Sequence, residues 1–153
     1  MKDILAFIDA AIELENTLSG LYAYFSNRFP DDFIFWDQLR IEELNHAALL
    51  GTIKNLSKVN LFPEGLVLED LDAYERNIRL INGNMNEPDI PDRKAAFEFA
   101  YQIENSAGEL HYQNKTLQED PDEITRIFIT LNGKDRDHAK RILAYQSPES
   151  TRI

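Results

Sequence analysis

The sequence predicts an all-α protein, an antiparallel four-helix bundle made of two helical hairpins joined by a long crossover that contains a short helix. The 153 residues include only six glycines and six prolines, as expected of long helices with short joints. Apolar residues recur at spacings of three and four over long stretches, which is the period of an amphipathic helix. Tight turns at Pro30 and Pro121 favour antiparallel neighbours over a coiled-coil rod, the competing all-α architecture.

The first hairpin is expected to join a helix over residues 3–29 to a helix that continues to about Ser57. The run Phe29-Pro30-Asp31-Asp32 supplies a stop, a turn and an N-cap between them. The second hairpin is expected to join a helix from Asp92 to about Leu117 to a helix that ends near Tyr145. Its start signal is Asp120-Pro121-Asp122-Glu123, with a cap, a proline at the first position and acidic residues at the positive end of the helix dipole.

The crossover spans about residues 58–91. Turn residues at Phe62-Pro63-Glu64-Gly65 and at Asn82-Gly83-Asn84 mark two loops. Between them, apolar positions from Leu68 to Ile81 indicate a short amphipathic helix. The chain length suits one domain over residues 1–146, followed by a flexible tail at residues 147–153.

Charge and composition exclude several classes of function. Lys and Arg number 16 against 27 Asp and Glu, for a net charge of −11, and so acidic a surface repels nucleic-acid phosphates. No cysteine is present, which excludes disulfides, thiolate catalysis, iron–sulfur clusters and a rubredoxin-type metal knot. Asp9 and Glu13 interrupt the first apolar run, so neither a signal peptide nor a membrane span is expected there. A cytoplasmic protein without membrane or nucleic-acid partners is the resulting expectation.

Polar residues interrupt all four apolar stripes near their middles. The helical spacing directs four carboxylates and two imidazoles at the core, namely Glu15 in the first helix, Glu43 and His46 in the second, Glu104 in the third, and Asp135 and His138 in the fourth. Each set lies about 20–25 Å from its own turn, because a helix rises about 1.5 Å per residue. The six side chains are therefore expected at a similar depth in the bundle.

Burying four unpaired carboxylates would cost several kcal/mol each, enough to cancel a typical domain stability of about 5–15 kcal/mol. Two divalent cations would balance the four charges, and carboxylate oxygens with one imidazole per ion suit iron or manganese, with zinc as a substitute. The spacing repeats between hairpins, since Glu43-x-x-His46 matches Asp135-x-x-His138. The alternative is a bundle whose polar centre holds no metal and whose carboxylates are partly protonated and hydrogen-bonded.

Other polar and aromatic residues receive a structural interpretation. The helical spacing places three acidic residues on solvated faces: Glu13, Glu42 and Glu98. His111 lies about 10 Å along the helix from Glu104, too far to share a metal; it either supports a ligand from behind or is solvent-exposed, and exposure is favoured. Three tyrosines near the predicted centre could hydrogen-bond a ligand or pass a radical, although ordinary aromatic packing is favoured for each: Tyr22, Tyr101 and Tyr112.

Over about residues 3–145 the chain resembles the rubrerythrin-like branch of the ferritin-like superfamily of di-iron carboxylate proteins. The residues that carry the resemblance are Glu15 with Tyr22, Leu39 with Glu43-x-x-His46, Glu104-x-x-Ala107, and Leu131 with Asp135-x-x-His138. The resemblance implies a ferritin-like fold and two iron ions. It makes Glu15 and Glu104 terminal ligands, makes Glu43 and Asp135 bridges, and leaves His46 and His138 to complete the two ions.

The resemblance also implies reaction with oxygen or peroxide and oxidation of Fe(II), as in a ferroxidase or a peroxidase-like oxidoreductase, in a homo-oligomer that is at least a dimer. Three departures bear on the activity. Asp135 is one methylene shorter than the usual Glu, Ala107 stands where peroxide-reducing rubrerythrins carry a carboxylate, and no rubredoxin domain is present. A peroxidase would therefore need an external electron donor. A metal carrier or storage module without turnover, and a metal-free interaction bundle, remain alternative hypotheses.

Overall fold

A computed structural model describes residues 2–59, 62, 71–86, 90–110 and 122–146. These parts contain five α-helices and one short 3-10 helix, and no strand. The helices are α1 (Lys2–Arg28), α2 (Phe33–Ser57), α3 (Leu71–Asn86), α4 (Arg93–Leu110) and α5 (Glu123–Gln146), and the 3-10 helix η1 (Pro30–Asp32) separates α1 from α2. The all-α class expected from the sequence is confirmed.

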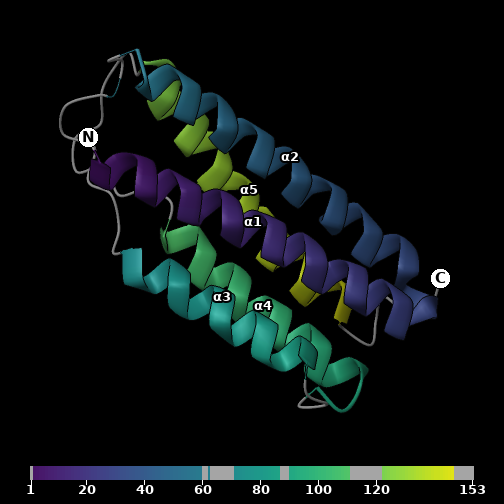
Figure 1. Cartoon of the computed structure of the whole chain (residues 1–153). Helices are drawn as coiled ribbons and strands as arrows, with labels where there is room; N and C mark the ends of the chain where they lie inside the picture. Colours follow the sequence, from purple (N-terminus) through teal and green to yellow (C-terminus); the bar gives the residue numbers. More distant parts are fainter. Residues whose placement is uncertain (1, 60–61, 63–70, 87–89, 111–121, 147–153) are drawn as a thin grey trace.

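The helices lie along one common direction (Figure 1). The helix α1 packs along α2, and α4 packs along α5, each pair antiparallel. The two pairs meet where α2 contacts α5. The helix α3 runs parallel to α1 and contacts both α1 and α4, so the chain returns along the bundle between its two hairpins.

Large apolar side chains fill the space between the hairpins. The largest buried ones are Trp36, Tyr22, Tyr74, Phe25, Phe97 and Phe128. The Trp36 ring lies 4.5 Å from that of Phe97, joining α2 to α4, and Tyr74 of α3 packs edge-on against Phe7 at 5.0 Å. Such aromatic contacts add to the free energy of area burial. No described helix is long and apolar enough to cross a membrane.

The end of α3 differs from the expectation. Asn82-Gly83-Asn84 was expected to form a loop, yet α3 continues through these residues to Asn86. Ile81 is buried and Met85 packs partly against the core, so the apolar stripe of the helix extends past the glycine. The Asn84 side chain donates to the carbonyl of Leu80 instead of forming a turn. Packing of the helix face therefore outweighs the local turn preference.

The helix starts also differ in detail. Asp32 occupies the N-cap position of α2 but makes no capping hydrogen bond. Its buried carboxylate instead accepts from Arg93 of α4, with Oδ2 2.7 Å from Nε and Oδ1 3.0 Å from Nη2. Asp122 caps α5, because its Oδ1 accepts from the backbone N–H of Thr125 at 2.8 Å. Asp120, Pro121, the turn at residues 63–65 and the tail at residues 147–153 lie outside the described residues.

Candidate metal centre

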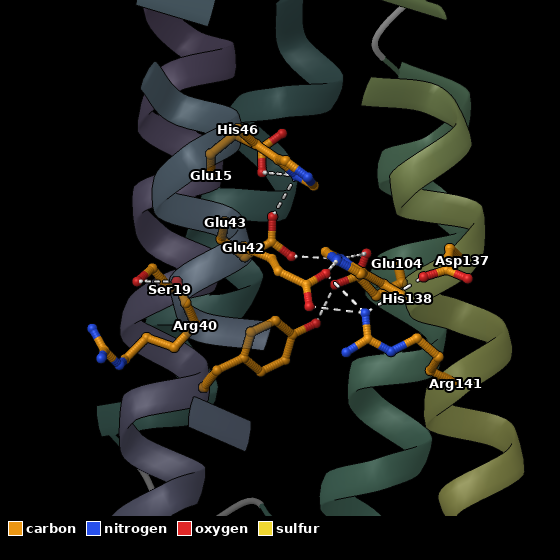
Figure 2. A network of polar contacts seen from close by, with 11 residues as sticks. Glu15, Ser19, Arg40, Glu42, Glu43, His46, Glu104, Asp137, His138 and Arg141 are labelled. Carbon is orange, nitrogen blue, oxygen red and sulfur yellow. Dashed lines mark hydrogen bonds and ion pairs between the residues drawn. The ribbon is translucent and has the colours of Figure 1, made fainter. Parts of the chain in front are cut away.

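Five of the six side chains expected at the centre are buried in the middle of the bundle. At most 4% of each is exposed: Glu15 of α1, Glu43 and His46 of α2, Glu104 of α4, and His138 of α5. Figure 2 shows them converging from both hairpins. Asp135 belongs to α5, but its side chain lies outside the described part of the chain, so its expected role as a bridge stays a prediction.

Glu43 lies between the two imidazoles. Its Oε1 is 2.9 Å from Nδ1 of His138, and its Oε2 is 3.0 Å from Nδ1 of His46. The two rings lie nearly parallel, with centroids 5.2 Å apart. Each oxygen of one carboxylate thus serves a different imidazole, which is the placement that a bridging ligand requires.

Each imidazole has a second carboxylate beside it. Oε2 of Glu15 lies 3.7 Å from Nδ1 of His46, and Oε2 of Glu104 lies 3.6 Å from Nδ1 of His138. The centre therefore divides into two similar halves, one with Glu15 and His46 and the other with Glu104 and His138, and Glu43 is common to both.

Several of these polar atoms lack the hydrogen bonds that buried groups normally make. In the described part of the chain, neither oxygen of Glu43 makes one, nor does Oε2 of Glu104, nor does Nδ1 of His138. Their short separations lack hydrogen-bond alignment, and buried polar atoms in native proteins are nearly always satisfied. Buried atoms of this kind, gathered in one cluster, fit metal ligands.

The charges of the centre are coupled. Burial raises the pKa of Glu43 well above its ordinary value, and the negative charges of Glu104 and Glu15 raise it further. Burial by itself lowers the pKa of His138, but the Glu104 and Glu43 carboxylates outweigh it and raise the pKa to about 11. In the metal-free protein, the negative charges of Glu104 and Glu43 therefore favour the protonated, positively charged form of His138. The same negative charges would attract a metal cation.

Glu42 corrects the interpretation from the sequence, which placed it on a solvated face. Its side chain is only one third exposed, and Oε2 lies 2.7 Å from Nε2 of His138. Nη1 of Arg141 donates to both oxygens of Glu42, at 3.0 and 2.8 Å. Burial acts to raise the pKa of Glu42, but Arg141 and His138 outweigh it and lower the pKa.

Tyr22 shows both of the features considered from the sequence, aromatic packing and a hydrogen bond to an expected ligand. The ring stacks on Trp36 with centroids 5.6 Å apart, as expected of a core aromatic. In addition, its hydroxyl donates a short hydrogen bond to Oε1 of Glu104. Packing and contact with an expected ligand therefore occur together in this residue, and Tyr22 fixes the position of the Glu104 carboxylate.

The remaining expectations have mixed outcomes. Glu13 and Glu98 are exposed, as expected, and Tyr101 is half-buried against the core. His111 and Tyr112 lie outside the described residues, as does the side chain of Ala107. The sequence gives no signal for the role of Glu42, because its contact with His138 depends on how α2 packs against α5.

The donor atoms are close enough to hold a metal. One atom each from Glu43, His46 and His138 lie within 4.8 Å of one another, and all three residues are buried. Carboxylate oxygens combined with imidazole nitrogens suit iron, manganese or zinc. This trio could hold one ion, whereas the full set with Glu15 and Glu104 provides ligands for two.

Comparison of the chain with protein-family models, with curated proteins and with solved structures finds no match.

Proposed function

We propose that the protein binds two metal ions at this centre, and that with iron it oxidises Fe(II) using oxygen or peroxide. One observation carries the proposal: the two oxygens of Glu43 lie 2.9 and 3.0 Å from the Nδ1 atoms of two imidazoles. One ion would take His46 and Glu15, the other His138 and Glu104, and Glu43 would bridge them. Asp135, one helical turn before His138 on α5, is a further predicted ligand.

The arrangement of the helices supports the same proposal. Two antiparallel hairpins are connected by a segment that returns along the bundle, which is the topology of bundles with one long crossover, including ferritin-like folds. In such folds, metal ligands project inward from all four long helices. Here the five buried residues come from α1, α2, α4 and α5, and we therefore assign the protein to the ferritin-like type.

The residues of the chain have distinct roles in this proposal. Two Fe(II) ions held by these residues would supply two electrons to dioxygen, which with two protons would give hydrogen peroxide and two Fe(III) ions. Glu15 and Glu104 bring negative charge that favours the more highly charged Fe(III) product. Tyr22 holds the Glu104 carboxylate by its hydrogen bond, and the burial of the five side chains of the centre keeps bulk water away from bound ions.

Aerobic titration of metal-free protein with Fe(II) tests the proposal. We expect oxygen consumption above that of buffer and a near-ultraviolet charge-transfer band that saturates at two iron ions per chain. Glu43→Gln should abolish both signals, and Glu98→Gln, which changes an exposed carboxylate on α4, should leave them unchanged. Saturation at two ions without oxygen uptake would instead indicate a carrier without turnover, and absence of binding would contradict the metal centre itself.

A further inference from the structure

Behind His138, on the side opposite Glu43, lies a second layer of charged groups. Nε2 of His138 is 2.7 Å from Oε2 of Glu42, while its Nδ1 faces Glu43. Both ring nitrogens are therefore engaged by carboxylates of α2, the helix across the interface (Figure 2). This contact belongs to the interface between α2 and α5, through which the two hairpins meet.

We propose that Glu42, supported by Arg141, is a positioning residue that keeps the proton on Nε2 of His138 and so presents Nδ1 to the ion on the Glu104 side. The inference rests on the proposed function and adds that the two ions depend on different residues. A histidine ligand commonly donates its second ring N–H to a carboxylate, which fixes the ring orientation and raises its basicity as a ligand.

Arg141 makes Glu42 suited to this role. Its Nη1 donates to both oxygens of Glu42 and also lies 3.4 Å from Oδ2 of Asp137. A free glutamate side chain has several rotamers, whereas these bonds hold the Glu42 carboxylate against the His138 ring. His138 is fully buried and Glu42 one third exposed, so the network extends from solvent to the centre.

The other half of the centre is built differently. Nδ1 of His46 lies 3.0 Å from Oε2 of Glu43 and 3.7 Å from Oε2 of Glu15, whereas the contacts described for Glu42 are with His138 and Arg141. Removal of the Glu42 side chain should therefore lower the affinity for the ion at His138 and leave the affinity for the ion at His46 unchanged. Removal of a carboxylate partner of a histidine ligand typically lowers metal affinity 10–100-fold.

Titration of metal-free Glu42→Ala with Co(II), in competition with a chelator, tests this. We expect one of the two bound Co(II) ions to bind 10–100-fold more weakly than in the wild type. The other Co(II) ion should bind with the wild-type affinity. Glu42→Gln keeps an oxygen that accepts from Nε2–H and should restore most of the affinity. The matched control Glu98→Ala removes an exposed carboxylate and should leave both equivalents unchanged.

Nitrogen-15 NMR of the histidines in the Zn(II)-loaded protein provides a second measurement, which a general loss of stability would not change. In the wild type we expect the Nε2–H proton of His138 to be protected from exchange with water, and in Glu42→Ala this protection should be lost. Equal weakening of both equivalents, or unchanged affinity with unchanged protection, would overturn the positioning role. Wild-type protein that binds no metal would overturn the proposed function itself, a result distinct from either.

Discussion

Glu43 is the residue whose replacement separates the metal hypothesis from a metal-free bundle most sharply. Because its two oxygens contact the imidazoles of both halves, Glu43→Gln should lower the affinity for both ions at once. The amide is nearly the same size, but its nitrogen donates and cannot ligate a cation. The change therefore removes the bridge while it preserves the packing.

The size of the effect follows from binding to the folded state alone. A ligand at 100 times its dissociation constant stabilises the folded protein by about 2.7 kcal/mol per site, or about 5 kcal/mol for two ions. For a chain of about 150 residues, each kcal/mol raises the melting temperature by about 2–4 °C. Metal should therefore raise the wild-type melting temperature by about 10–20 °C and raise that of Glu43→Gln only slightly.

The metal-free forms should behave in the opposite way. Three buried carboxylates face two imidazoles, and the charges of Glu104 and Glu15 already raise the pKa of Glu43. Burial and those charges favour the neutral form of Glu43, and an amide is neutral at any pH, so metal-free Glu43→Gln should melt no lower than the metal-free wild type.

Thermal unfolding followed by circular dichroism, with and without Mn(II) or Zn(II), measures both effects. Glu98→Gln serves as the control, because that carboxylate is exposed on α4 and should leave the metal-induced increase intact. An equally large increase in Glu43→Gln would refute the bridging role. No increase in the wild type would refute the metal centre.

Three further predictions concern the metal-free protein. The pKa of His138 is raised from 6.5 to about 11, so its stabilising contribution should be complete below pH 6.5 and lost as the pH rises toward 11, at up to about 1.4 kcal/mol per pH unit. Urea unfolding between pH 6 and pH 11 measures this loss of stability. If the free energy of unfolding of His138→Gln declined equally over that range, His138 would not be its cause. Tyr22→Phe removes the hydrogen bond to buried Glu104 and should lower the free energy of unfolding by about 1–3 kcal/mol; no change in a urea midpoint would show that the bond contributes nothing. Asp32→Ala leaves Arg93 without its partner across the hairpins and should cost about 1–3 kcal/mol, whereas an unchanged melting temperature would indicate that solvent replaces the ion pair.

The residues of the centre could be predicted from the sequence, because helical spacing determines both which side chains are buried and how deep they lie in the bundle. Glu15, Glu43, His46, Glu104 and His138 each replace an apolar residue in a regular stripe, and the turn positions place them at one level. Their convergence follows from helix geometry and the positions of the two turns alone.

Contacts between helices were harder to predict. Glu42 lies off the inward stripe of α2, but its side chain reaches His138 on α5, and spacing along one helix does not encode that reach. Asp32 was expected to cap its own helix but pairs with Arg93, since a charged partner 61 positions away offers a stronger bond than a local N–H. Gly83 suggested a loop, but the burial of Ile81 and the packing of Met85 keep α3 helical.

The contact between Glu43 of one hairpin and His138 of the other also restricts how the two hairpins can slide past each other. Apolar stripes tolerate a shift of one helical turn, about 5.4 Å, because one leucine replaces another. The same shift would separate His138 from both Glu43 and Glu42 and leave the buried charges facing hydrocarbon. The polar centre thus selects a single alignment of the hairpins during folding, before any ion arrives.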